Sequence, residues 1–147
     1  MQELMRKKYS NFLSEEDISY LYDTLVVSDK YYVLKTKNEV VNKIINKLKL
    51  DFDFTVKEKS YFKIEQTGQE GHDWHVDTGS NNHMMWCELG GTILLKADYQ
   101  GGKTYYKEDD KVVEVERGIG DLCAHRSDIE HKVDPTTGNR QVFLIFI

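Results

Sequence analysis

The stretch HKVDPTTGNR, residues 131–140, decides the fold of this chain. It predicts strand, turn and strand, because Pro135 and Gly138 supply the residue types that tight turns require. The second strand then returns toward the first, which places Arg140 beside His131. We therefore expect a β-rich fold in which an imidazole and a guanidinium share one site.

A second stretch, HVD at residues 75–77, carries the chemistry. Side chains alternate along a strand, so His75 and Asp77 project from one face while Val76 points into packing. With His131 brought in from a distant strand, two imidazoles and one carboxylate form a facial triad that leaves coordination positions open for non-haem Fe(II). Open positions predict a catalytic metal site rather than a structural one.

Arg140 predicts what binds beside the metal. The planar guanidinium fork matches a carboxylate through two parallel hydrogen bonds. A dicarboxylate that chelates the metal at one end would be held at its other end by Arg140. This description fits 2-oxoglutarate.

Four segments in a fixed order carry a family resemblance: residues 73–77 (DWHVD), the Gly101-Gly102 strand, residues 120–122 (GDL), and residues 131–140. On these segments the chain resembles the Fe(II)/2-oxoglutarate-dependent dioxygenases, and among them the prolyl 4-hydroxylase-like group. The resemblance runs from about Tyr61 to Ile147.

The resemblance implies a role for each matched residue. His75, Asp77 and His131 would bind Fe(II), Arg140 would hold the far carboxylate of 2-oxoglutarate, and Val142 would line the same pocket. The implied reaction is hydroxylation of a C–H bond by O2, with succinate and CO2 as co-products and ascorbate as reductant. The implied substrate is a prolyl peptide or protein, although small molecules are handled on similar cores.

One position departs from the family pattern. Prolyl hydroxylases usually place a tyrosine on the strand before the His-x-Asp motif, where its hydroxyl helps bind the co-substrate, but this chain has Glu65 there. A carboxylate would repel an anionic ligand. Tyr61 and Lys63 share the face of Glu65 by the period of two, and we expect Tyr61 to substitute, with Lys63 as the alternative.

All five histidines lie between residues 72 and 131, which fits a site at the mouth of a barrel. We expect His72, His83 and His125 to be loop or supporting residues rather than ligands.

Two helical patterns precede the strands. Ser14 predicts a helix cap with Asp17 three residues on, and a second amphipathic pattern begins at about Asn38. The apolar positions at helical spacing are Ile18, Leu21, Tyr22 and Leu25 in the first, and Val41, Ile44, Ile45 and Leu48 in the second.

From Asp51 onward the period changes to that of short strands. The positions that indicate it are Phe52, Phe54 and Val56, then Val113 and Val115, then residues 142–147. The sequence thus predicts a mainly β (α+β) single domain, 1–147: a double-stranded β-helix, or jelly roll, over about 51–147, buttressed by two N-terminal helices within about 1–50.

Composition sets further limits. The 147 residues are 39% apolar and 31% charged, which suits one domain with a real core. The first eight residues hold no apolar segment like a signal peptide, so we expect a cytoplasmic protein without a membrane partner. The net charge of −5 gathers in the part after residue 50, and an acidic surface disfavours nucleic acid relative to a peptide, protein or small-molecule substrate.

Two other functions remain open at this stage. The same roll could hold Zn(II) on His72, His75, Asp77 and His131 and act as a hydrolase. Alternatively, the domain could be a binding module that has lost turnover. Only the oxygenase should make succinate from 2-oxoglutarate in an Fe(II)-dependent way.

Overall fold

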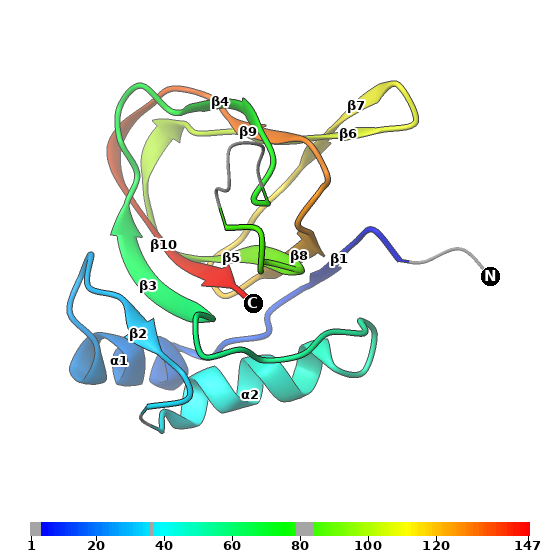
Figure 1. The fold of residues 1–147 in the computed structure, drawn as a ribbon. Coiled ribbons are helices and arrows are strands. Elements are labelled where there is room, and N and C mark those ends of the chain that lie inside the picture. Colours follow the sequence, from blue (N-terminus) through cyan, green and yellow to red (C-terminus); the bar gives the residue numbers. More distant parts are fainter. Residues whose placement is uncertain (1–3, 36, 79–83) are drawn as a thin grey trace.

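A computed structural model of the chain describes residues 4–35, 37–78 and 84–147. Two antiparallel sheets face each other, and two helices lie beneath the larger sheet (Figure 1). No helix within these described ranges is long and apolar enough to cross a membrane.

The larger sheet has six strands. In spatial order they are β1 (Arg6–Tyr9), β8 (Leu122–Arg126), β5 (Leu89–Gly101), β10 (Thr136–Phe146), β3 (Tyr61–Gln66) and β2 (Tyr31–Tyr32). The smaller sheet has four, which are β4 (His72–His75), β9 (His131–Val133), β6 (Thr104–Glu108) and β7 (Lys111–Val115). The predicted roll, buttressed by helices, is confirmed.

The stretch 131–140 forms two strands with a turn between them, but these strands do not pair with each other. β9 pairs with β4 and β6 in the smaller sheet, whereas β10 pairs with β5 and β3 in the larger one. The turn at Asp134 and Pro135 therefore carries the chain from one sheet to the other. His131 and Arg140 face a common cavity from two layers instead of lying side by side.

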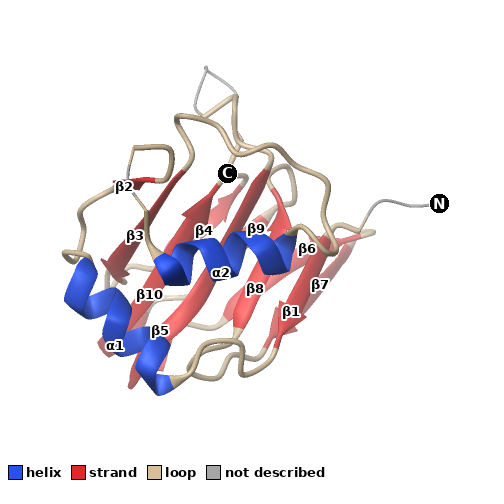
Figure 2. Ribbon diagram, turned by 90° about the horizontal axis from the view of Figure 1, so that it is seen from below, coloured by secondary structure: helices blue, strands red, loops and turns tan. Residues whose placement is uncertain are grey.

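Both helices begin where the sequence predicts. Helix α1 (Glu15–Thr24) has the capping box of Ser14 and Asp17, and α2 (Glu39–Leu48) is capped by the Asn38 side chain. Figure 2 shows both helices against one face of the larger sheet. The buried face of α2 consists of Val40, Val41, Ile44, Ile45 and Leu48.

The alternation along β10 separates the core from the cavity. Phe143 and Ile145 are fully buried in the cluster beneath the sheet, and the Phe143 ring stacks on Phe62 at 5.5 Å between centroids. The intervening Val142 and Leu144 line the cavity between the sheets. One strand therefore stabilises the helical layer with one face and shapes the site with the other.

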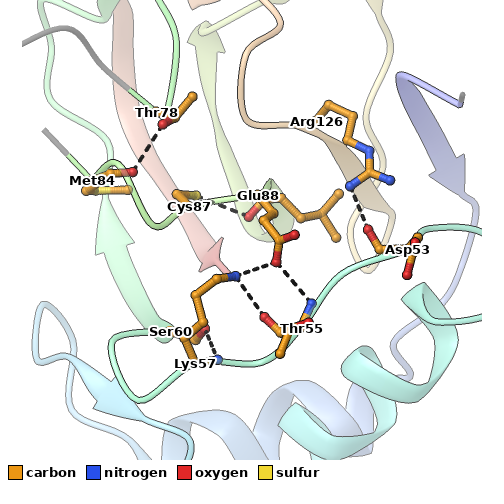
Figure 3. A network of polar contacts seen from close by, with 10 residues as sticks. Asp53, Thr55, Lys57, Ser60, Thr78, Met84, Cys87, Glu88 and Arg126 are labelled. Carbon is orange, nitrogen blue, oxygen red and sulfur yellow. Dashed lines mark hydrogen bonds and ion pairs between the residues drawn. The ribbon is translucent and has the colours of Figure 1, made fainter. Parts of the chain in front are cut away.

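The strand predicted around Phe52, Phe54 and Val56 is wrong. Residues 52–56 form an extended loop in which Phe52 is buried in the core and the other two side chains pack partly against it. The loop takes side-chain partners in place of a neighbouring strand. The contacts are drawn in Figure 3: the Thr55 amide donates to Glu88, Lys57 pairs with Glu88, and Arg126 donates to the Asp53 carbonyl.

The segment before residue 51 is also not purely helical. β1 precedes α1 and pairs with β8 at the edge of the larger sheet, in the register Arg6 with His125 through Tyr9 with Leu122. Its three consecutive basic residues, Arg6, Lys7 and Lys8, gave no apolar signal for a strand.

Replacement of Asn38 by alanine is expected to lower the free energy of unfolding by about 1–2 kcal/mol, measured by urea denaturation. The side chain is buried, accepts from the amides of Val40 and Val41, and donates to Thr24 in α1. Asn38→Asp keeps the acceptor and loses only the donor, so its loss should be smaller. An unchanged free energy in Asn38→Ala would contradict the capping role.

Candidate metal centre

Three predicted ligands converge where β4 meets β9. His75 ends β4, His131 begins β9, and the two residues are direct partners in the ladder. Asp77 lies two residues beyond the end of β4, where its amide donates to the Ser127 carbonyl at 2.9 Å. One donor atom from each of His75, Asp77 and His131 lies within 4.8 Å of the others, so this cluster could hold a metal ion.

Backbone contacts orient both imidazoles toward this point. The Nδ1 of His75 is 2.7 Å from the Asp73 carbonyl, and the Nδ1 of His131 is 3.0 Å from the Ile129 carbonyl. Since a carbonyl only accepts, each Nδ1 must carry the proton. The Nε2 lone pair of each ring is then the one available to a metal.

The Asp77 carboxylate is buried between the imidazoles of His125 and His131. Its Oδ2 lies 2.6 Å from His125 Nε2, and its Oδ1 lies 3.3 Å from His131 Nε2. Burial alone would raise the pKa of Asp77, but hydrogen bonds from His125 and His131 outweigh it and hold the pKa far below its usual range. The carboxylate is therefore ionised at neutral pH and ready to bind a cation.

The surroundings shift the pKa values of the two histidines in opposite directions. Burial lowers the pKa of His75 to about 4, which keeps this ring neutral. Burial also acts to lower the pKa of His131, but the neighbouring Asp77 carboxylate reverses the effect and raises it. A metal ion and a proton would compete for the Nε2 lone pair of His131, so protonation of this ring would oppose metal binding.

His125 supports the carboxylate from the larger sheet. It is 3% exposed, donates through Nε2 to Asp77, and accepts through Nδ1 from the Tyr106 hydroxyl at 2.9 Å. Gly90 makes room for the pair, because a Cβ there would lie 1.8 Å from Asp77 Oδ2. His125 is thus a supporting residue, as predicted, and it fixes the direction of one carboxylate oxygen.

Arg140 lines the same cavity, which has a volume of about 410 Å³ and is bounded by both sheets. Its side chain is 3% exposed, and its Nη1 donates to Thr67 Oγ1 at 2.8 Å. Its Nε is buried without a hydrogen-bond partner among the described residues. Val142 also lines the cavity, two residues along β10. The structure therefore brings the predicted clamp and the predicted triad into one cavity.

The residues that could take the role of the family's missing tyrosine lie along β3. Tyr61, Lys63 and Glu65 all line the cavity, as the period of two predicts. Glu65 pairs with Lys63 at 3.1 Å, which offsets part of its repulsion for an anion. Tyr61 is paired with Phe146, at the other end of β10 from Arg140, and burial raises its pKa to about 12. Its role in binding the co-substrate stays a prediction.

The sequence predicted a role for some of the other site residues and missed others. His72 is exposed, and its ring stacks on His75 at 3.6 Å, whereas His83 lies outside the described residues. Sequence reasoning missed Tyr106, Thr67 and Gly90. Only Gly90 had a signal, because a glycine inside a strand pattern marks a close approach.

Comparisons of sequence and comparisons of structure with known proteins gave different results. No protein-family model matches the sequence, and no curated protein does. Solved structures match over nearly the whole chain.

A Pseudomonas putida prolyl-4-hydroxylase has a TM-score of 0.69 at 14% identity, over 96% of this chain and 90% of that one. The 2-oxoglutarate complex of a viral collagen prolyl hydroxylase from Paramecium bursaria Chlorella virus-1 has a TM-score of 0.64 at 15% identity, over 97% and 94%. A Trichoplax adhaerens prolyl hydroxylase, in complex with a hypoxia inducible factor oxygen degradation domain peptide fragment, has a TM-score of 0.64 at 14% identity, over 97% and 83%. The chain has the fold of these proteins, the double-stranded β-helix that the resemblance implied.

Replacement of His125 by phenylalanine is expected to weaken Mn(II) binding roughly ten- to hundredfold in isothermal titration calorimetry. The ring is kept, but Asp77 loses the donor that fixes Oδ2, and Tyr106 loses its acceptor. His125→Gln retains an N–H group and should recover part of the affinity. Circular dichroism checks that both variants are folded; unchanged Mn(II) affinity in folded His125→Phe would contradict the supporting role.

Proposed function

We propose that this protein is an Fe(II)- and 2-oxoglutarate-dependent dioxygenase that hydroxylates a C–H bond. A single observation carries the proposal. One cavity contains both a cluster suited to a divalent cation, formed by His75, Asp77 and His131, and a buried guanidinium suited to a carboxylate, Arg140. The fold shared with the prolyl hydroxylases supports it.

The donor set fits Fe(II). Two neutral imidazoles and one carboxylate are the ligands of non-haem Fe(II) oxygenases. In this chain the three side chains face a cavity, so the remaining coordination positions of the metal would also face it. Bound Fe(II) would catalyse the oxidative decarboxylation of 2-oxoglutarate by O2 to succinate and CO2. The same reaction would hydroxylate the substrate. Ascorbate would serve as the reductant that maintains Fe(II).

The protein's own residues position these partners. His75 and His131 present Nε2 because their Nδ1 protons are held by carbonyl groups, and Asp77 is held ionised by His125. Arg140 would fix the far carboxylate, which sets the distance between the co-substrate and the metal. The apolar Val142 and Leu144 line the space between the clamp and the metal cluster and limit water there.

The substrate we propose is a peptide or protein, on the prolyl 4-hydroxylase pattern. The Trichoplax adhaerens neighbour binds a peptide fragment, and the acidic surface disfavours a phosphate backbone. A cytoplasmic location, one domain over 1–147, and the absence of nucleic-acid and membrane partners stay predictions. A screen of prolyl peptides for Fe(II)-dependent stimulation of succinate formation tests the substrate class.

Replacement of Asp77 or His131 by alanine is expected to abolish Fe(II)-dependent succinate formation, because two of three ligands cannot hold the metal in an active geometry. Succinate is measured by mass spectrometry with and without added Fe(II). His72→Ala is the matched control: it removes an imidazole that stacks on His75 and should leave the reaction intact. Substantial turnover in Asp77→Ala or His131→Ala would refute the ligand assignment.

Anaerobic addition of Fe(II) and 2-oxoglutarate is expected to produce a weak visible charge-transfer band, and Arg140→Ala is expected to lose it at the same ligand concentrations. The alanine removes the group that holds the far carboxylate. Lys96→Ala removes an exposed cation from the neighbouring strand β5 and should keep the band. Bound metal without a band in the wild-type protein would overturn the proposal and favour a zinc enzyme or a binding module.

A further inference from the structure

Arg117 is a second arginine in the cavity, one that the sequence patterns did not single out. It lies in the segment between β7 and β8, and its Nη2 donates to the Thr92 carbonyl at 2.9 Å. It lines the same cavity as Arg140. The two guanidiniums come from different elements of the fold, so the fold itself brings them to one cavity.

Unsatisfied polar groups gather around these arginines. The Nε atoms of Arg117 and Arg140 and the hydroxyl of Thr104 are buried without a hydrogen-bond partner among the described residues, and all three residues line the cavity. A buried donor without a partner carries a desolvation cost, and such groups in a folded protein need an explanation. A ligand that accepts hydrogen bonds from all three would supply it.

The positive charge of Arg117 and Arg140 also indicates a bound ligand. Among the described residues, neither Arg117 nor Arg140 forms an ion pair with a carboxylate. Burial and the positive charge of Arg117 both lower the pKa of Arg140. Two neighbouring cations that lack a counter-charge favour a bound anion.

Three acidic residues line the cavity, and among the described residues none of them forms an ion pair with either arginine: Glu65, Glu70 and Asp77. Asp77 is held by His125 and His131, and Glu65 is paired with Lys63.

Strand register places the unsatisfied groups at one end of the cavity. Thr104 pairs with Val115, two residues before Arg117, and Arg140 pairs with Ala97 near the end of β5. A Cβ on Gly102 would lie 3.0 Å from Arg140 Cδ, so the Arg140 side chain lies against the turn between β5 and β6.

The metal cluster lies at the opposite end of the pairing between β5 and β10. Gly90, which adjoins Asp77, pairs with Phe146. Val142 and Leu144 on β10 lie between this level and that of Arg140.

We propose that Arg117 and Arg140 together bind the far carboxylate of 2-oxoglutarate, with the Thr104 hydroxyl as a further donor. The inference rests on the proposed function and names the residue that takes the place of the family's tyrosine. Arg117 supplies the donor that the Glu65 position cannot. A carboxylate held by two guanidiniums makes the pocket selective for dicarboxylic over monocarboxylic 2-oxo acids.

The test compares two ligands and four proteins by isothermal titration calorimetry in the presence of Mn(II) without O2. 2-Oxopentanoate matches 2-oxoglutarate at the metal-binding end and lacks the far carboxylate. Arg117→Gln is expected to raise the Kd for 2-oxoglutarate about tenfold or more and to leave the Kd for 2-oxopentanoate unchanged. Arg117→Lys keeps the charge but loses the fork, and should fall between the wild type and Arg117→Gln.

Lys111→Gln is the matched control, because it removes one positive charge from the exposed start of β7. It should bind both ligands as the wild type does. Unchanged binding of 2-oxopentanoate to Arg117→Gln also shows that the variant site is folded.

The outcomes separate this inference from the proposed function. If the wild type binds 2-oxoglutarate and Arg117→Gln binds it equally well, or loses both ligands equally, the inference fails and the proposed function stands. If the wild type binds no 2-oxoglutarate although Mn(II) is bound, both fail.

Discussion

The buried hydrogen bond between Asp77 and His125 joins the two sheets at the site. Asp77 follows β4 of the smaller sheet, whereas His125 belongs to β8 of the larger one, and their atoms are 2.6 Å apart. An ionised carboxylate in this interior is tolerated only because both of its oxygens have partners. Gly90 must stay without a side chain for the contact to form. The position of the metal cluster and the spacing of the layers thus depend on the same contact.

The rest of the architecture supports this arrangement through β10. Its core face, with Phe143 and Ile145, is buried over the helices, and its other face lines the cavity. A slip of one residue would exchange the two faces and place Arg140 in the apolar core. Pairing on both sides, with β5 and with β3, opposes such a slip. Packing beneath the sheet therefore fixes which side chains reach the cavity.

Much of this could be predicted from the sequence, because strand periodicity and helix capping act locally. The helix cap at Ser14, the helix start at about Asn38 and the layered β fold followed from local patterns. The grouping of the distant His131 with His75 and Asp77 followed from the family resemblance. The errors concern long-range partners. The loop at 52–56 has alternating apolar residues but takes its hydrogen bonds from side chains, and β9 and β10 separate into different sheets. Arg117 has no motif of its own, so only the folded chain shows that it reaches the cavity.

The two ends of the cavity carry side chains of opposite charge. The Asp77 end, without a metal ion, presents an ionised carboxylate that repels an anion, whereas the Arg140 end attracts one. A dicarboxylate entering the metal-free cavity would gain at one end and lose at the other. A divalent cation on the triad reverses the sign at the first end, so that both carboxylates of the ligand are then stabilised. For the proposed function, this charge distribution would favour an order of binding in which the metal precedes 2-oxoglutarate, and it would couple the two affinities without any movement of the fold.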